Sequence, residues 1–99
     1  MATITLDAYV LDTLLPDLVG HDRQPSAFLV YVYLWRHTIG VGAPVVQTSL
    51  QDITLGTGLS KRAVQDALGL LMRRKLLGVT RASITAIPVY TVKRPWVRS

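Results

Sequence analysis

The sequence predicts a mainly α-helical fold with a small β-hairpin, of the α+β class, built as a single domain over residues 1–99. Three observations favour this fold. Helix-capping residues alternate with glycine stop signals in the middle of the chain. Apolar residues recur there at helical spacing. Near the end of the chain, two short runs rich in β-branched residues flank a few small ones, as in a hairpin.

The composition is that of a folded protein, with 49% hydrophobic and 17% charged residues. The net charge of +5 is unevenly distributed along the chain. Residues 1–24 carry four Asp and one Arg, whereas residues 25–99 carry ten bases and two Asp. A basic body with a separate acidic segment favours a polyanionic partner. The alternative is a mildly basic protein without such a partner.

A first helix is expected over residues 8–19, with Asp7 as its cap. Pro16 is expected to kink this helix or to split it in two, because proline lacks the backbone N–H that a helix needs. Residues 1–25 form an N-terminal helical extension in this interpretation, and a polar loop closes it.

The second expected helix runs from Ser26, as its cap, to about Ile39, because Gly40 and Gly42 follow as stop signals. Its sequence is apolar nearly all round, so other elements must cover more than one of its sides. The first helix and a second subunit are the expected covers. We therefore expect a homodimer through the N-terminal and aromatic helices, using the apolar side chains Leu14, Leu18, Tyr31 and Trp35.

The middle of the chain carries the most specific signals. A short strand is expected over Val45–Thr48, before a capping box in Ser49–Asp52. The helix that follows, over 50–57, must stop at Gly58, which accepts the left-handed conformation of a tight turn. Ser60 then caps a longer helix, expected to end near Lys75.

This longer helix has two distinct faces. Stepping 100° per residue places an apolar set on its buried face: Val64, Ala67, Leu68 and Leu71. The opposite face carries Arg62, Gln65, Asp66, Gly69 and Arg73. Gly69 is expected to let a neighbouring backbone come close.

The segment from Ser49 to Leu68 resembles the core of bacterial winged helix-turn-helix regulators. The resemblance rests on an apolar residue before a small one, on Thr57-Gly58-Leu59-Ser60, and on Val64 and Leu68 of the next helix. It extends over residues 26–94, leaving 95–99 as a tail. The resemblance implies duplex DNA binding in transcriptional or replication control, with the helix of residues 60–75 in the major groove.

Strands are expected over Leu76–Arg81 and Ile87–Arg94, and the resemblance makes this hairpin the wing. The expected tip, residues 82–86, is short and uncharged, whereas wings often carry Arg or Lys. This composition counts against a tip that reads bases.

The DNA-binding residues that the resemblance implies are Ser60, Lys61, Arg62, Gln65, Asp66, Arg73, Arg81 and Arg94. Arg62 is suited to bidentate pairing with guanine, and Gln65 to pairing with adenine. Asp66 repels phosphate, so it accepts from cytosine or orients its neighbours. The alternative for Arg62 and Asp66 is a solvated ion pair at i,i+4 spacing.

No sequence pattern suggests catalysis, a cofactor or a metal site, because His21 and His37 are isolated and no nucleophile or phosphate-loop motif is readable. Without cysteine, a readable signal peptide or a membrane-length apolar run, the chain is expected to be cytoplasmic. Trp35 is expected in the core or an interface, and Trp96 to pack on the body or a partner. The competing hypothesis is a winged helix retained for protein–protein assembly, supported by the uncharged tip, the acidic first segment and an exposed Leu70.

Overall fold

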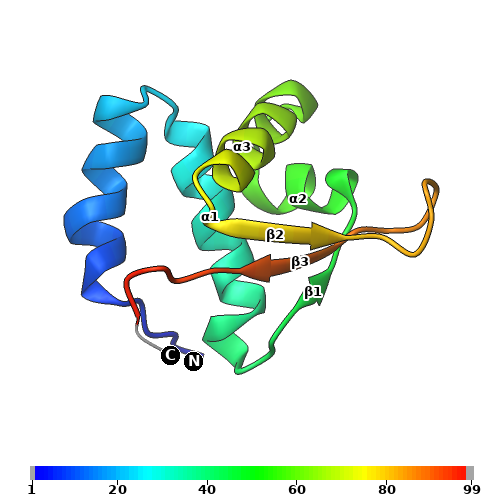
Figure 1. Ribbon diagram of the computed structural model, residues 1–99, viewed down its shortest axis with the longest axis horizontal. Helices are drawn as coiled ribbons and strands as arrows, with labels where there is room; N and C mark the ends of the chain where they lie inside the picture. Colours follow the sequence, from blue (N-terminus) through cyan, green and yellow to red (C-terminus); the bar gives the residue numbers. More distant parts are fainter. Residues whose placement is uncertain (1, 98–99) are drawn as a thin grey trace.

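The computed structural model describes residues 2–97, and it opens with helical winding over residues 8–21 (Figure 1). Two stretches of this helix have the wider π-type turn, η1 (Val10–Leu14) and η2 (Asp17–His21). Pro16 does not split the segment, because the winding continues through it. The expected cap was wrong: the Asp7 side chain makes no capping hydrogen bond, and only its backbone carbonyl accepts, from the N–H of Val10.

Helix α1 (Pro25–His37) is the centre of the fold. It begins one residue before the expected cap, because Pro25 occupies the first turn, where its fixed φ suits a helix, and Gln24 is the N-cap residue. The expectation that several elements cover it is confirmed, since α1 packs against η2, α2, α3 and β3. It ends at His37, before the short turn η3 (Ile39–Val41).

The two helices that follow confirm the local signals of the sequence. Helix α2 (Leu50–Thr57) begins with the complete capping box of Ser49 and Asp52 and ends at Gly58, whose φ of 79° is left-handed. Helix α3 (Lys61–Arg73) is capped by the Ser60 hydroxyl. It ends two residues earlier than expected, because Lys75 adopts a left-handed φ of 59°.

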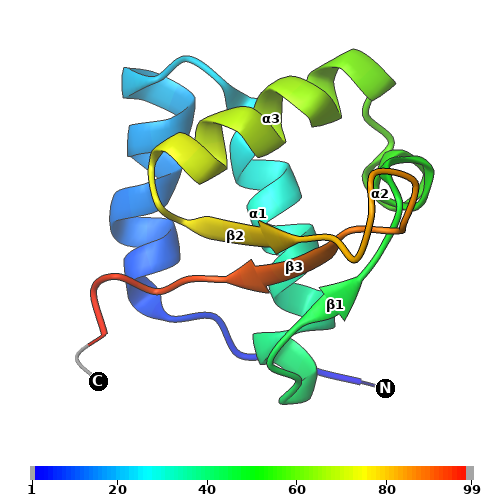
Figure 2. The ribbon, with the colours of Figure 1, turned by 45° about the vertical axis from the view of Figure 1, so that its right-hand side comes forward.

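A three-stranded antiparallel sheet covers one side of this helical core (Figure 2). The strands β1 (Val46–Gln47), β2 (Leu77–Thr80) and β3 (Val89–Val92) lie in the order β1-β3-β2. The hairpin of β2 and β3 pairs Leu77 with Val92 and Thr80 with Val89. Both expected hairpin strands are therefore present, in shorter form. The structure is an α+β fold, as the sequence predicts.

The four side chains expected to serve a dimer interface are all inside one chain. Leu14 is 2% exposed, and Leu18, Tyr31 and Trp35 are fully buried. They pack in a single core with the apolar face of α3, which is buried at all four expected positions. Leu70 is also partly buried against this core, contrary to the expectation that it is exposed. A homodimer, which stays a prediction, would have to use other side chains.

The tail packs back on the first helix. The ring of Trp96 stacks on Tyr9, with 4.4 Å between the ring centroids, and the Trp96 indole N–H donates to Asp7 at 3.0 Å. The expectation that Trp96 packs on the body is confirmed. The end of the expected tail, Arg98 and Ser99, lies outside the described residues. Over residues 2–97, no helix has the length and apolar character needed to cross a membrane.

Gly56 has a packing role that its sequence position did not reveal. A Cβ atom added there would overlap the ring of Tyr33, which lies against α2 and next to His37. We expect Gly56→Ala to destabilise the protein, because the ring must move. In a Tyr33→Ala background the same substitution should instead stabilise it by about 0.5–1 kcal/mol, through helix propensity alone. Urea unfolding of the wild type and the three variants measures both effects. A stability change of the same sign in the two backgrounds would contradict the packing role.

Candidate nucleic-acid interface

Helix α3 is oriented by its own amphipathic pattern. Its apolar face is buried, so the polar residues at its start and along its outer side are held toward solvent. The Ser60 hydroxyl accepts a hydrogen bond from the N–H of Ala63 at 3.1 Å, which fixes the first turn. Lys61 and Arg62 follow directly and are both exposed. The first turn of α3 therefore presents two cations from a rigid helix end.

Arg62 forms the ion pair that was the alternative to a DNA contact. Its Nε lies 3.5 Å from Oδ2 of Asp66, one helical turn away. The two side chains are 86% and 58% exposed, so water screens the pair and its contribution to stability is at most a few tenths of a kcal/mol. A phosphate or a base edge can displace Asp66 at little cost.

A hollow of about 360 Å³ separates α3 from the loop of the β2–β3 hairpin. Gln65 and Leu68 line it from α3, and Arg81, Thr85 and Ala86 line it from the hairpin. Tyr90 also lines it; burial raises the pKa of its hydroxyl, and the nearby Arg81 cation opposes that shift. The fold thus brings Gln65 and Arg81 to opposite walls of one hollow.

A second hollow, of about 420 Å³, lies between the outer side of α3 and the start of α1. Its α3 wall includes Asp66, Gly69 and Arg73, and Gln24 and Ser26 form the other side. No backbone of the described chain comes close to Gly69, contrary to expectation, and a Cβ there would meet only the Arg73 guanidinium, at 3.4 Å. The space in front of Gly69 is open to an incoming molecule.

Gln24 and Ser26 line this hollow beside α3, and the sequence did not associate them with that helix. The Nε2 atom of Gln24 is buried and has no hydrogen-bond partner among the described residues. Nothing local in the sequence indicated that these residues lie beside Arg73, which is about fifty positions later. Only the packing of α1 against α3 brings them together.

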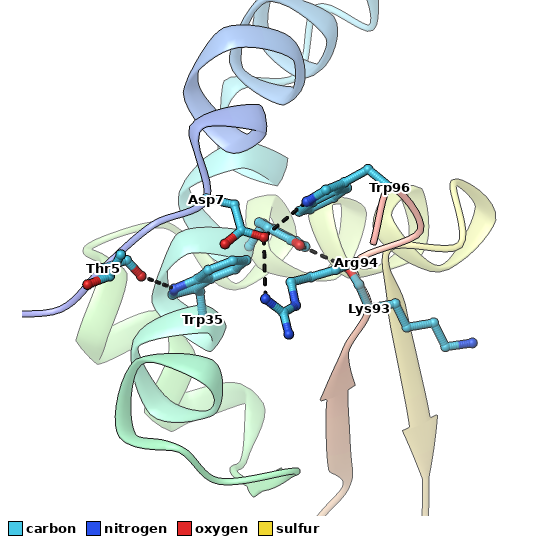
Figure 3. Close-up of polar contacts among 7 residues, drawn as sticks. Thr5, Asp7, Trp35, Lys93, Arg94 and Trp96 are labelled. Carbon is cyan, nitrogen blue, oxygen red and sulfur yellow. Dashed lines mark hydrogen bonds and ion pairs between the residues drawn. The ribbon is translucent and has the colours of Figure 1, made fainter. Parts of the chain in front are cut away.

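Arg94 lies away from α3 and from the loop of the β2–β3 hairpin. Its guanidinium donates to Oδ2 of Asp7 at 3.3 Å and lies 5.8 Å from the ring centroid of Trp35 (Figure 3). It follows the end of β3 that pairs with the start of β2, whereas the hairpin loop joins the opposite ends of these strands. The structure therefore separates Arg94 from the other expected DNA-binding residues, because Asp7 holds it at the first helix.

The acidic first segment is largely used inside the molecule. Arg74, after the end of α3, forms ion pairs with both Asp17 and Asp22 of the first helical segment, and Asp7 pairs with Arg94. By contrast, Lys61, Arg73 and Arg81 form no ion pair with any described residue. We call the set Lys61, Arg62, Gln65, Asp66, Arg73 and Arg81 the α3–hairpin face. Its positive charge is available to a partner, whereas that of Arg74 and Arg94 is compensated.

The two histidines lie apart from this face. The ring of His37 packs beside that of Tyr33 at the end of α1, with 4.7 Å between centroids, and His21 ends η2. Residues 2–97 contain no cluster of three or more His, Cys, Asp or Glu that would hold a metal ion. The chain matches no family model, and comparisons with curated proteins and with solved structures found no match.

Proposed function

We propose that the chain is a winged helix-turn-helix domain that binds duplex DNA, with α3 in the major groove and the β2–β3 hairpin as its wing. The observation that carries the proposal is the α3–hairpin face: exposed cations and an amide side chain on one rigid helix, flanked by an open hollow. An α-helix fits the major groove, and Arg and Gln there read guanine and adenine. The chain then acts in transcriptional or replication control, as a binding protein without catalysis.

The charge distribution supports the same proposal. Asp17, Asp22 and Asp7 compensate basic residues away from the α3–hairpin face, so they do not oppose a polyanion there. The open hollows beside Arg73 and Arg81 leave these two cations accessible to the phosphates that border a major groove. Each neutralised phosphate steepens the dependence of log K on log salt by about 0.9.

The experiment is fluorescence anisotropy of a labelled mixed-sequence duplex at low and moderate salt. We expect salt-dependent binding that Arg62→Ala weakens about tenfold, because a well-placed Arg–guanine contact is worth roughly 1–3 kcal/mol. The matched control is Arg36→Ala, which removes the same exposed charge from the hollow on the far side of α1 and α2. Arg36→Ala should bind nearly as well as the wild type.

Two outcomes would count against the proposal. The absence of binding by the wild type at low salt would refute DNA binding. Equal losses of DNA affinity in Arg62→Ala and Arg36→Ala would mean that binding depends on net charge alone, with no specific role for α3. Circular dichroism of each variant establishes beforehand that both are folded.

A second candidate function is protein–protein assembly, favoured by apolar side chains on the side of α1 and α2 away from α3. Leu29 is 47% exposed and Leu55 is 75% exposed. Leu29 lines a hollow of about 370 Å³ together with Ile4, Tyr33 and Gly56. Self-association that depends on Leu29 and persists in a protein that does not bind DNA would favour this function.

A further inference from the structure

We propose that the hollow between the start of α1 and the outer side of α3 binds a small phosphate monoester, which then competes with DNA. The binding site is argued from this hollow alone, whereas its effect on DNA rests on the proposed function. The hollow measures about 420 Å³, within the range of roughly 300–1,000 Å³ that is typical of small-ligand sites. Its walls carry groups that donate or accept hydrogen bonds: Gln24, Ser26, Gln65, Asp66 and Arg73.

Arg73 supplies a cation inside this hollow. Its Nη1 atom lies 3.4 Å from the position that a Cβ atom at Gly69 would occupy, so the side chain folds back along α3. The missing side chain of Gly69 leaves room for this arrangement. Arg73 forms no ion pair with any described residue, and a guanidinium can donate two parallel hydrogen bonds to one phosphate. The hollow therefore contains an uncompensated cation suited to a phosphate.

The side-chain amide of Gln24 is a donor without an acceptor. Its Nε2 atom is buried, so neither solvent nor any described residue accepts its hydrogen bonds. A buried donor left unpaired costs free energy, which an incoming acceptor recovers. The residue as a whole is only partly buried, and the last torsion of a glutamine side chain is soft, so the amide can turn toward the hollow. An oxygen atom of a ligand would be the acceptor that this amide lacks.

The start of α1 adds donors to the same wall. Ser26 lies in the first turn of this 13-residue helix, and no side chain caps the helix. The free backbone N–H groups of a first turn attract anions. With Arg73 on the opposite wall, donors flank the hollow on both sides. A phosphate monoester has three terminal oxygens to accept from such a set, whereas a carboxylate has two.

The other groups of the hollow indicate what the phosphate is attached to. The carboxylate of Asp66 repels a phosphate, so the phosphate must lie toward Arg73 and Gln24. Asp66 is paired with Arg62 at 3.5 Å, which weakens this repulsion. The side-chain oxygens of Asp66 and Gln65 can accept hydrogen bonds from hydroxyl groups. The ligand expected here is therefore the phosphate monoester of a small polyhydroxyl compound.

A ligand in this hollow is expected to oppose DNA binding. Gln65, Asp66 and Arg73 line the hollow and also belong to the α3–hairpin face, which the proposed function places against the duplex. A bound ester brings negative charge to that face and covers these three side chains. Because the two ligands share one surface, each lowers the apparent affinity of the other.

The test of the site uses ribose 5-phosphate, with ribose, inorganic phosphate and sodium chloride at equal ionic strength as comparison solutes. Isothermal titration calorimetry compares the wild type, Gln24→Leu and the control Gln47→Leu, which makes the same change at an exposed residue of β1. We expect Gln24→Leu to bind ribose 5-phosphate about tenfold more weakly, because a hydrogen bond to a charged group is lost. Gln47→Leu should bind it like the wild type. Thermal unfolding of Gln24→Leu should occur at or above the wild-type temperature, because the substitution removes an unpaired buried donor.

The effect on DNA is measured by anisotropy of a labelled duplex as ribose 5-phosphate is added at constant ionic strength. We expect the ester to weaken duplex binding by the wild type and by Gln47→Leu. In Gln24→Leu the ester should have little effect, although this variant binds the duplex like the wild type when no ester is present.

The outcomes separate the site from the function. Binding of ribose 5-phosphate that is no tighter than that of inorganic phosphate, or that is equal in the wild type and Gln24→Leu, would overturn the site. Loss of duplex affinity and of about 0.9 of the salt slope in Gln24→Leu, without ester binding by the wild type, would assign the hollow to the DNA backbone and overturn it too. Ester binding through Gln24 by a protein that binds no duplex would end the proposed function and the competition, and leave the site. If Gln24→Leu does not fold, Arg73→Ala takes its place, with the same tenfold loss required.

Discussion

Replacement of Leu18 by alanine is expected to lower the free energy of unfolding by about 2–5 kcal/mol. Leu18 lies in η2 with no exposed surface, at a point where η2 packs against α1. Removing its side chain deletes buried apolar area and leaves a cavity that the surrounding core fills only in part. The sequence resemblance does not include residues 1–25, so a large effect here would establish that the first helix is integral to the domain.

The matched control for Leu18 is Leu11→Ala in the same helical segment. Leu11 is 49% exposed, so its truncation should change stability by less than about 0.5 kcal/mol. Urea denaturation followed by circular dichroism gives both values. Small and equal losses in the two variants would mean that the first helix is an appendage and not part of the core.

Stability is expected to fall steeply above about pH 10, because of Tyr31. Burial raises the pKa of this hydroxyl, with a smaller contribution in the same direction from Asp7 and an opposing one from Arg94. The hydroxyl donates to the carbonyl of Lys93 at 2.9 Å and can do so only when protonated. Its pKa is higher in the folded protein, so the stabilisation is complete below the pKa of the unfolded chain. It is lost as the pH rises from there toward the folded pKa.

The alkaline loss can be measured by urea unfolding at intervals from about pH 8 to about pH 12. Each pH unit above the unfolded pKa removes up to about 1.4 kcal/mol for one such group. Tyr31→Phe should cost about 1 kcal/mol at neutral pH, through the lost hydrogen bond, and should then decline less steeply. Part of the decline remains, because burial also raises the pKa of Tyr90. The more exposed Tyr33 provides the control variant Tyr33→Phe, and an identical pH slope in all three proteins would exclude Tyr31 as the cause.

The elements whose signals are local could be predicted from the sequence. The capping box of Ser49 and Asp52, the turn at Gly58 and the cap at Ser60 all form as expected. Each involves groups only a few residues apart, so the sequence contains every partner. The buried face of α3 was predictable for the same reason, because helical spacing alone determines which side chains share a face.

The expectations that the structure contradicts concern contacts between residues far apart in the sequence. Asp7 was expected to cap the first helix, yet its carboxylate binds Arg94 and Trp96, which lie 87 and 89 positions later. Two charge-assisted partners outweigh one backbone N–H. Tyr31 and Trp35 are expected from the sequence to serve a dimer interface, with the core as the other place for Trp35, and both are buried in one chain because the first helix, α3 and the sheet enclose α1.

The candidate site was predicted in part. Helical periodicity predicts which residues lie on the exposed side of α3, and Arg62 and Gln65 do lie there. Gln24 and Ser26 lie beside α3 only because α1 packs against that helix, which the sequence does not show. Arg94 has the positive charge of a phosphate-binding residue and follows a predicted strand. Its position depends instead on Asp7, a partner 87 positions earlier in the sequence.

The positions of the two chain ends have a practical consequence. The first described residues and the segment after β3 both leave the molecule on the side opposite α3 (Figures 1 and 2). A dye or an affinity tag attached at either end would therefore be held clear of that helix. Protein immobilised on a sensor surface by either end would present α3 to the solution, so the choice of tethering point should leave its accessibility to a flowing analyte unchanged.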